Sequence, residues 1–117
     1  MIQLAALLLA ICPPGPRDNC VVDGDTFWLS GEKVRVENID TPEIEGKCAR
    51  ERGLAIRARD RLLELLNSGD VVMRRSGTDR YGRTLARIRV NGRDVGETLV
   101  AEGLARRWEG RRREWCG

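Results

Sequence analysis

The feature that most constrains the fold is a change of hydrophobic period near residue 48. Before it, short apolar runs are separated by turn signals, and residues 23–26 (Asp-Gly-Asp-Thr) contain the Asp-Gly pair that is typical of a tight hairpin. Alternation of apolar and polar side chains on either side of this turn predicts strands. The expected strands cover residues 20–22, 26–30 and 33–39.

After this point the period becomes helical. Across residues 48–66 the apolar side chains fall on one face of a helix, with arginine and glutamate elsewhere. Strands are expected again at 71–75 and 85–90, and Asp94 can cap a short helix over 95–103. This order of elements predicts an α+β protein: an OB-fold, which is a five-stranded antiparallel barrel, with two or three helices. Such a barrel exposes a face and loops that suit oligonucleotides, although a fold alone does not give a function.

The absence of histidine narrows the chemistry that these 117 residues can perform. No imidazole can act as base, nucleophile or metal ligand, and the few serines lack a base partner for acyl transfer. Charge is unevenly distributed: residues 1–70 carry 9 basic and 12 acidic side chains, and residues 71–117 carry 12 basic and 6 acidic ones. This asymmetry in one small domain indicates a polyanionic partner such as nucleic acid, although a solvated basic surface would give the same pattern.

The four cysteines are an even number in a small domain, which favours two disulfides in an oxidising compartment. No two of them form a C-x-x-C pair, so the usual zinc spacings are absent. Three pairings exist, and we favour Cys12–Cys20 across a turn-rich segment together with Cys48–Cys116, which would tie the C-terminus to the helix. Buried free thiols in a cytosolic protein are the alternative.

The N-terminal stretch is apolar from Leu4 to Ile11, which is too short to span a membrane as a helix. It is similar to the core of an export signal or anchor that lacks a basic start, and a first strand followed by a Pro-Gly turn is the alternative. Because export agrees with the expected disulfides, we predict a periplasmic or secreted protein. Residues 1–19 form this segment and its turn in the expected organisation, and residues 20–117 form the folded domain.

Three charged segments lie at the predicted turns and strand ends: Asp23–Thr26, Arg35–Glu43 and Asp79–Arg83. Each alone is explained by turn structure. Taken in order, they resemble the staphylococcal-nuclease-like (thermonuclease) family over roughly residues 21–107. The resemblance rests on D-G-D-T, on an arginine five residues before D-T-P-E, on D-x-Y-G-R, and on the later helix E-T-L-V-A-E-G-L-A. It implies an OB barrel and Ca²⁺-dependent cleavage of DNA and RNA.

The resemblance also implies roles for the acids. Asp25 and Asp40 match carboxylate ligands of the calcium, and Thr41 matches the residue that gives its backbone carbonyl. Hard oxygen donors of this kind suit Ca²⁺. Glu43 matches the acid that reaches the water shell of the metal and orients or deprotonates the attacking water.

Arg35 and Arg83 match the two arginines that clamp the scissile phosphate. Attack on phosphorus spreads negative charge over its oxygens, and guanidinium forks fixed there in advance stabilise that charge. Tyr81 matches a residue that touches the nucleotide, with packing beside the strand as the alternative. We also assign Trp108 as a stacking platform for a base, and expect Trp115 to cap the core.

The chain differs from fuller family members in two places. The segment 44–48 is short, and the longer C-terminal helical part found in such members is missing. A Cys48–Cys116 disulfide is expected to compensate, because closing a long loop contributes roughly 2–4 kcal/mol. The arginines at 111–113 are expected only to add to the basic field.

These observations favour an exported, calcium-dependent nuclease with little sequence preference. We expect it to prefer single-stranded nucleic acid, to act as a monomer with no stable membrane partner, and to leave 5′-hydroxyl and 3′-phosphate ends. One alternative hypothesis is a non-catalytic OB module that only binds nucleic acid, and another is a small secreted structural or interaction domain. Mere binding needs neither metal-binding acids nor paired arginines, and this argues for the enzyme. The residues concerned are Asp25, Arg35, Asp40, Glu43 and Arg83.

Overall fold

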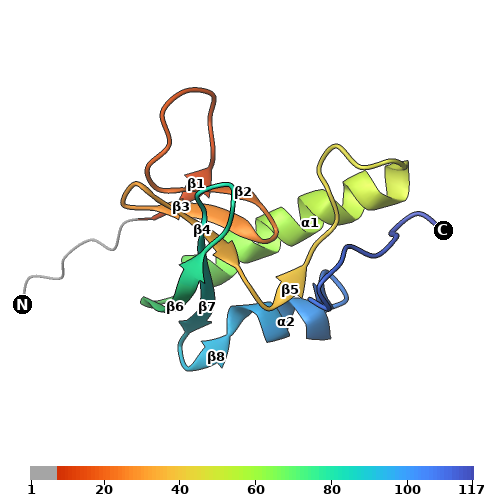
Figure 1. Ribbon diagram of the computed structural model, residues 1–117. Helices are drawn as coiled ribbons and strands as arrows, with labels where there is room; N and C mark the ends of the chain where they lie inside the picture. The colour runs from red at the N-terminus through yellow and green to blue at the C-terminus, as the bar shows by residue number, and fades with distance from the viewer. Residues whose placement is uncertain (1–7) are drawn as a thin grey trace, which may run out of the picture.

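A computed structural model describes residues 8–117 as short strands with two helices packed against them (Figure 1). The α+β class is therefore confirmed, and the five predicted strands correspond to β2, β3, β4, β6 and β7. In chain order the elements are β1 (Ala10–Ile11), β2 (Cys20–Asp23), β3 (Thr26–Leu29), β4 (Glu32–Val36), β5 (Ile39–Asp40), α1 (Ala49–Leu66), β6 (Val71–Thr78), β7 (Thr84–Val90), β8 (Arg93–Asp94), α2 (Val95–Ala101) and β9 (Arg106–Arg107).

The main sheet has the strand order β1-β2-β3-β4-β7-β6, and β8 pairs with β7. The pairing of β4 with β7 is parallel, so the sheet is mixed and the expectation of an all-antiparallel barrel is wrong at this point. The reason is topological: α1 carries the chain across the sheet to β6, and the β6–β7 hairpin then reverses it, so that β7 runs alongside β4 in the same direction. Across the described residues, the strand pairings form an open path rather than a closed ring.

The predicted third strand is split in two. Its first part, β4, ends at Val36, whose N–H donates to the carbonyl of Asp25 at 2.8 Å. After a short turn the chain forms β5, in which Ile39 and Asp40 pair with β9 of the C-terminal segment instead of with the main sheet. Asp40 is thus placed against the C-terminal segment, which the alternation of residues 33–39 did not predict.

Helix α1 confirms its predicted bounds, and Cys48 occupies its N-cap position. Ala58 and Leu62 on its inner face are fully buried in the core that it shares with the sheet. The turn between β2 and β3 lies directly against this face: a Cβ added at Gly24 would come within 2.7 Å of the Cβ of Ala58. Only glycine therefore allows the Asp-Gly-Asp-Thr turn to pack here. This contact with α1 fixes the positions of Asp23 and Asp25, on either side of the glycine.

Helix α2 is also confirmed, with Asp94 as its N-cap accepting from the N–H of Glu97 at 2.9 Å. Its last residue is Ala101, two residues short of the predicted end. The chain leaves α2 through Gly103, whose φ of +75° suits a helix terminus without a Cβ.

Both predicted disulfides, Cys12–Cys20 and Cys48–Cys116, are confirmed. The second brings the C-terminal segment to the start of α1 (Figure 1). The first ties β1 to β2, with which β1 pairs in parallel, so Ala10 and Ile11 form a strand. Residues 1–7 of the predicted N-terminal segment lie outside the described residues. Within residues 8–117, neither helix combines the length and apolar character needed to cross a membrane.

Candidate active site

A cleft of about 710 Å³ brings together six of the eight side chains singled out from the sequence. The other two, Asp40 and Thr41, are buried next to it and touch Arg112, which also lines the cleft. The six predicted residues that line the cleft are Asp25, Arg35, Glu43, Tyr81, Arg83 and Trp108. Segments that are distant in the sequence therefore meet at one surface.

Asp25 is positioned by the hairpin turn between β2 and β3. Its N–H donates to Oδ1 of Asp23 at 3.2 Å, and its Oδ1 accepts from the hydroxyl of Thr26 at 3.0 Å. Thr26 faces Arg35 in the β3–β4 pairing, so the guanidinium of Arg35 reaches Oδ2 of Asp25 at 3.7 Å. The turn, the hydroxyl and the arginine together hold a buried carboxylate at the edge of the cleft.

Asp23 is a cleft residue that the sequence analysis did not single out. Burial, and then the nearby charge of Asp25, raise the pKa of Asp23 to about 8. When two carboxylates lie this close, their negative charges repel each other, and a bound cation would relieve that repulsion. The signal was visible in the sequence, because Asp23 and Asp25 flank the same glycine.

Asp40 ends the short strand β5 and Thr41 follows it, and each is 2 % exposed. Burial, with a further contribution from Asp25, raises the pKa of Asp40, while the guanidinium of Arg112 opposes that rise. One oxygen of Asp40, Oδ1, accepts from Nη1 of Arg112 at 3.0 Å. The other, Oδ2, is buried and has no hydrogen-bond partner among the described residues.

An unpartnered buried carboxylate oxygen is costly, and a bound cation would satisfy it. Asp25, Asp40 and the carbonyl of Thr41 offer only hard oxygen donors, which are the donors that Ca²⁺ and Mg²⁺ take. The residues present therefore fit a divalent cation of this class.

A second group of candidate ligands, Glu51, Glu114 and Cys116, also lies close together, with ligand atoms within 4.8 Å of one another. Cys116 is in a disulfide, so its sulfur is not a thiolate. Glu51 already accepts from the N–H groups of Glu43 and Lys47. We therefore do not assign a metal centre to this group.

Arg83 is held by the loop between β6 and β7. Asp79 accepts from its N–H at 3.0 Å and from its Nε at 2.8 Å, and also accepts from the N–H of Tyr81 at 3.0 Å. Burial acts against ionisation of Asp79, but these bonds outweigh it and lower its pKa. Gly82 closes the loop at a φ of +79°, a conformation that side chains with a Cβ disfavour. Asp79 thus fixes Arg83 before any substrate arrives.

The two predicted aromatic residues lie beside the two arginines. The guanidinium of Arg35 stands 5.3 Å from the centroid of the Trp108 ring, and that of Arg83 stands 5.5 Å from the ring of Tyr81. Both rings are exposed, at 40 % for Trp108 and 65 % for Tyr81. Trp115, in contrast, is buried as expected.

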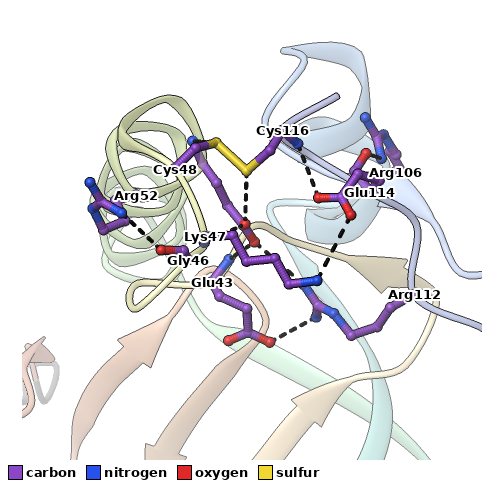
Figure 2. The surroundings of a disulfide bond; sticks show 10 residues. Glu43, Gly46, Lys47, Cys48, Arg52, Arg106, Arg112, Glu114 and Cys116 are labelled. Atoms are coloured by element: carbon purple, nitrogen blue, oxygen red, sulfur yellow. Dashed lines mark hydrogen bonds and ion pairs between the residues drawn. A yellow bond between two sulfur atoms is a disulfide. The ribbon is translucent and has the colours of Figure 1, made fainter.

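Glu43 lines the same cleft and is half-exposed. Its backbone N–H donates to the buried carboxylate of Glu51 at 3.0 Å, and this bond is the main reason that the pKa of Glu51 is lowered. Its own carboxylate meets Nη1 of Arg112 at 2.8 Å (Figure 2). The prediction that the arginines at 111–113 only add to the basic field is therefore wrong for Arg112, whose partners are too distant in sequence to be found from a motif.

Residues 33–115 match the family described as "Staphylococcal nuclease homologue". The chain belongs to this family. The match covers most of the chain and includes every predicted site residue except Asp25, which precedes it. The family resemblance inferred from the three motifs is thus confirmed.

Named relatives of this nuclease-homologue chain come from several bacteria. It is 39 % identical over 94 residues to "Endonuclease YncB" and, over the same length, to "SPbeta prophage-derived endonuclease YokF", both of Bacillus subtilis (strain 168). It is 34 % identical over 91 residues to "Succinoglycan biosynthesis protein ExoI" of Rhizobium meliloti (strain 1021). Each alignment covers 73 % of this chain but only 44 %, 31 % and 48 % of the respective relative. The chain therefore spans about half or less of these proteins.

Proposed function

We propose that the chain is a calcium-dependent phosphodiesterase that cuts DNA and RNA internally, with little sequence preference. The observation that carries this proposal is the meeting of two arginines, Arg35 and Arg83, with the buried acids Asp25 and Asp40 around one cleft. Family membership and the endonuclease names of two relatives support the same conclusion. The resemblance further suggests 5′-hydroxyl and 3′-phosphate products.

The two arginines bind and orient the scissile phosphate in this proposal. Arg35 comes from β4 and Arg83 from the loop that precedes its neighbour β7, and each is held by an acid, Asp25 and Asp79 respectively. Their guanidinium groups can each donate two hydrogen bonds to phosphate oxygens, which lysine could not do. Because they are fixed in advance, they stabilise the charge that develops as the phosphate is attacked.

Glu43 accepts a proton from the attacking water. Its carboxylate is at the cleft and half-exposed, so water can reach it. Asp25, Asp40 and the carbonyl of Thr41 would hold the calcium ion, which when bound supplies positive charge to the phosphate and binds water. No histidine is required for any of these roles.

Tyr81 and Trp108 contact the nucleotide bases. Exposed aromatic rings beside phosphate-binding arginines suit stacking with any base, which fits low sequence preference and favours single strands. The substrate would be single-stranded DNA or RNA, bound by a monomer. The two disulfides support export to the periplasm or outside the cell, without a stable membrane partner.

Cleavage of single-stranded DNA tests the proposal, measured with Ca²⁺ and with a chelator. The parent should cleave only with Ca²⁺, and Glu43→Gln should lower kcat by about 10²-fold or more. Glu45→Gln is the matched control, because Glu45 is exposed outside the cleft and its change removes the same charge two residues away. Binding of DNA without Ca²⁺-dependent cleavage would reject the enzyme and favour the non-catalytic OB module.

A further inference from the structure

The guanidinium of Arg112 lies among four acidic or carbonyl groups that come from two other parts of the chain, residues 40–43 and helix α1. Its Nη1 contacts Oδ1 of Asp40 at 3.0 Å and Oε1 of Glu43 at 2.8 Å. Its Nη2 lies 3.5 Å from the carbonyl of Thr41 and 3.8 Å from Oε2 of Glu51. One side chain therefore bridges residues to which the proposed function gives different tasks.

Two of these partners are the proposed cation ligands. Asp40 and Thr41 would contribute a carboxylate oxygen and a carbonyl oxygen to the ion, and Arg112 contacts both residues. A guanidinium is a cation, so its charge lies where the positive charge of the metal would be needed. Like charges this close repel each other strongly next to a buried carboxylate, because little water screens them.

The position of Arg112 is set by anchors on both sides of it. On one side β9 pairs with β5, and on the other Cys116 is bonded to Cys48 at the start of α1. Trp115 is buried under the guanidinium of Arg106, which lies 3.8 Å from its ring centroid. Figure 2 shows Arg112 reaching from this anchored segment toward Glu43, on the same side of α1 as the disulfide.

We propose that Arg112 is a further residue of the active site, which competes with the cation for Asp40 and Thr41 and thereby sets the cation affinity. This proposal rests on the proposed function, since it takes those two residues as cation ligands. Arg112 is 44 % exposed in its side chain and can swing into solvent when the ion binds. The Cys48–Cys116 disulfide keeps it close enough to return.

Calorimetric titration of the parent and of Arg112→Gln with CaCl₂, in the absence of nucleic acid, tests the proposal. We expect Arg112→Gln to bind Ca²⁺ about threefold to thirtyfold more tightly, which corresponds to the loss of one or two partly exposed ion pairs. The matched control is Arg113→Gln, which removes the same charge from the neighbouring residue, whose partner is Glu109. Arg113→Gln should leave the affinity within about twofold of the parent, because it alters only the screened field.

Equal Ca²⁺ affinity in the parent and Arg112→Gln would overturn the proposal and leave the proposed function intact. Weaker binding by Arg112→Gln would also overturn it, because Arg112 would then support the ligands rather than compete for them. Absence of Ca²⁺ binding in both proteins would overturn the proposal together with the calcium part of the proposed function. The shift in thermal unfolding temperature caused by Ca²⁺ gives a second readout that needs no catalysis.

The tether can be tested separately with the pair Cys48→Ser/Cys116→Ser. Releasing the C-terminal segment lowers the local concentration of Arg112, so the double variant should bind Ca²⁺ more tightly than the parent, by less than Arg112→Gln does. Adding the two serines to Arg112→Gln should change the affinity no further. Additive effects would show that the disulfide acts independently of Arg112 and would overturn the tether.

Discussion

Arg83 and Arg112 are both paired with acids at the same cleft, but they are held in opposite ways. Arg83 is bonded to Asp79, four residues away in the same loop, and its side chain is only 22 % exposed. Arg112 is 44 % exposed, and its partners include Asp40, 72 residues away, and Glu43. Asp79 has no proposed role in catalysis, whereas Asp40 and Glu43 do.

This difference separates a fixed cation from a displaceable one. Asp79 accepts from Nε of Arg83, and Nη1 reaches the hydroxyl of Thr26 only at 3.4 Å, so the arginine is positioned with donors for a phosphate before substrate binds. Arg112 instead covers the acids that must act, so it has to move before they can. The local pair Arg83–Asp79 therefore prepares the site for substrate, whereas the long-range pairs of Arg112 block the acids until it moves.

The largest effect is expected from the anchor of the Arg112 segment. Cys48–Cys116 joins residues 68 apart, and Cys12–Cys20 joins residues 8 apart. By loop-closure entropy, Cys48→Ser/Cys116→Ser should lower the free energy of unfolding by about 4 kcal/mol, and Cys12→Ser/Cys20→Ser by about 2–3 kcal/mol. Urea denaturation measures both, and an equal or reversed order would show that loop length does not govern this stabilisation.

Next in size is the loss of the fixed arginine. Arg83→Ala should lower kcat for DNA cleavage by about 10²-fold, because the charge that develops on the phosphate loses a prepared donor. Arg89→Ala on the following strand β7 is the control, since Arg89 is exposed and its side chain donates to the carbonyl of Gly92, outside the cleft. A similar loss in both variants would mean that Arg83 contributes only to the general positive field.

Asp79→Asn should have a smaller effect, about a tenfold loss of kcat, because Arg83 stays in place but loses its orienting charge. Single-turnover cleavage rates at saturating DNA isolate this effect from binding. Unchanged kcat would show that Arg83 does not depend on Asp79, and would remove the basis for calling Arg83 fixed.

A separate prediction concerns the pH dependence of stability and Asp23, which has no arginine partner among the ion pairs of residues 8–117. Because the pKa of Asp23 is raised to about 8 in the folded protein, the folded state retains a proton that the unfolded state has lost. Stability of the metal-free protein should therefore fall as the pH rises from about 4 to about 8. Asp23→Asn should flatten this dependence in thermal unfolding, and an unaltered pH profile would contradict the assignment.

Much of the fold, and the pairing of Arg83 with Asp79, could be predicted from the sequence. Strands, helices and caps follow from local patterns, and the motif D-x-Y-G-R contains both Arg83 and its partner Asp79. The parallel β4–β7 pairing and the β5–β9 pairing could not be predicted in this way, because they depend on where the chain returns after α1 and α2. Arg112 was missed for the same reason: its partners are distant in the sequence, and nothing in its local run of arginines distinguishes it from its neighbours.

The distinction between a fixed Arg83 and a displaceable Arg112 is tested most directly by measuring DNA cleavage as a function of Ca²⁺ concentration. The proteins compared are the parent, Arg83→Gln and Arg112→Gln. We expect Arg83→Gln to lower the maximal rate and to leave the half-saturating Ca²⁺ concentration unchanged. Arg112→Gln should instead lower the half-saturating Ca²⁺ concentration about threefold or more. Loss of maximal rate in both variants, with no change in the Ca²⁺ requirement of either, would show that Arg112 does not compete with the cation.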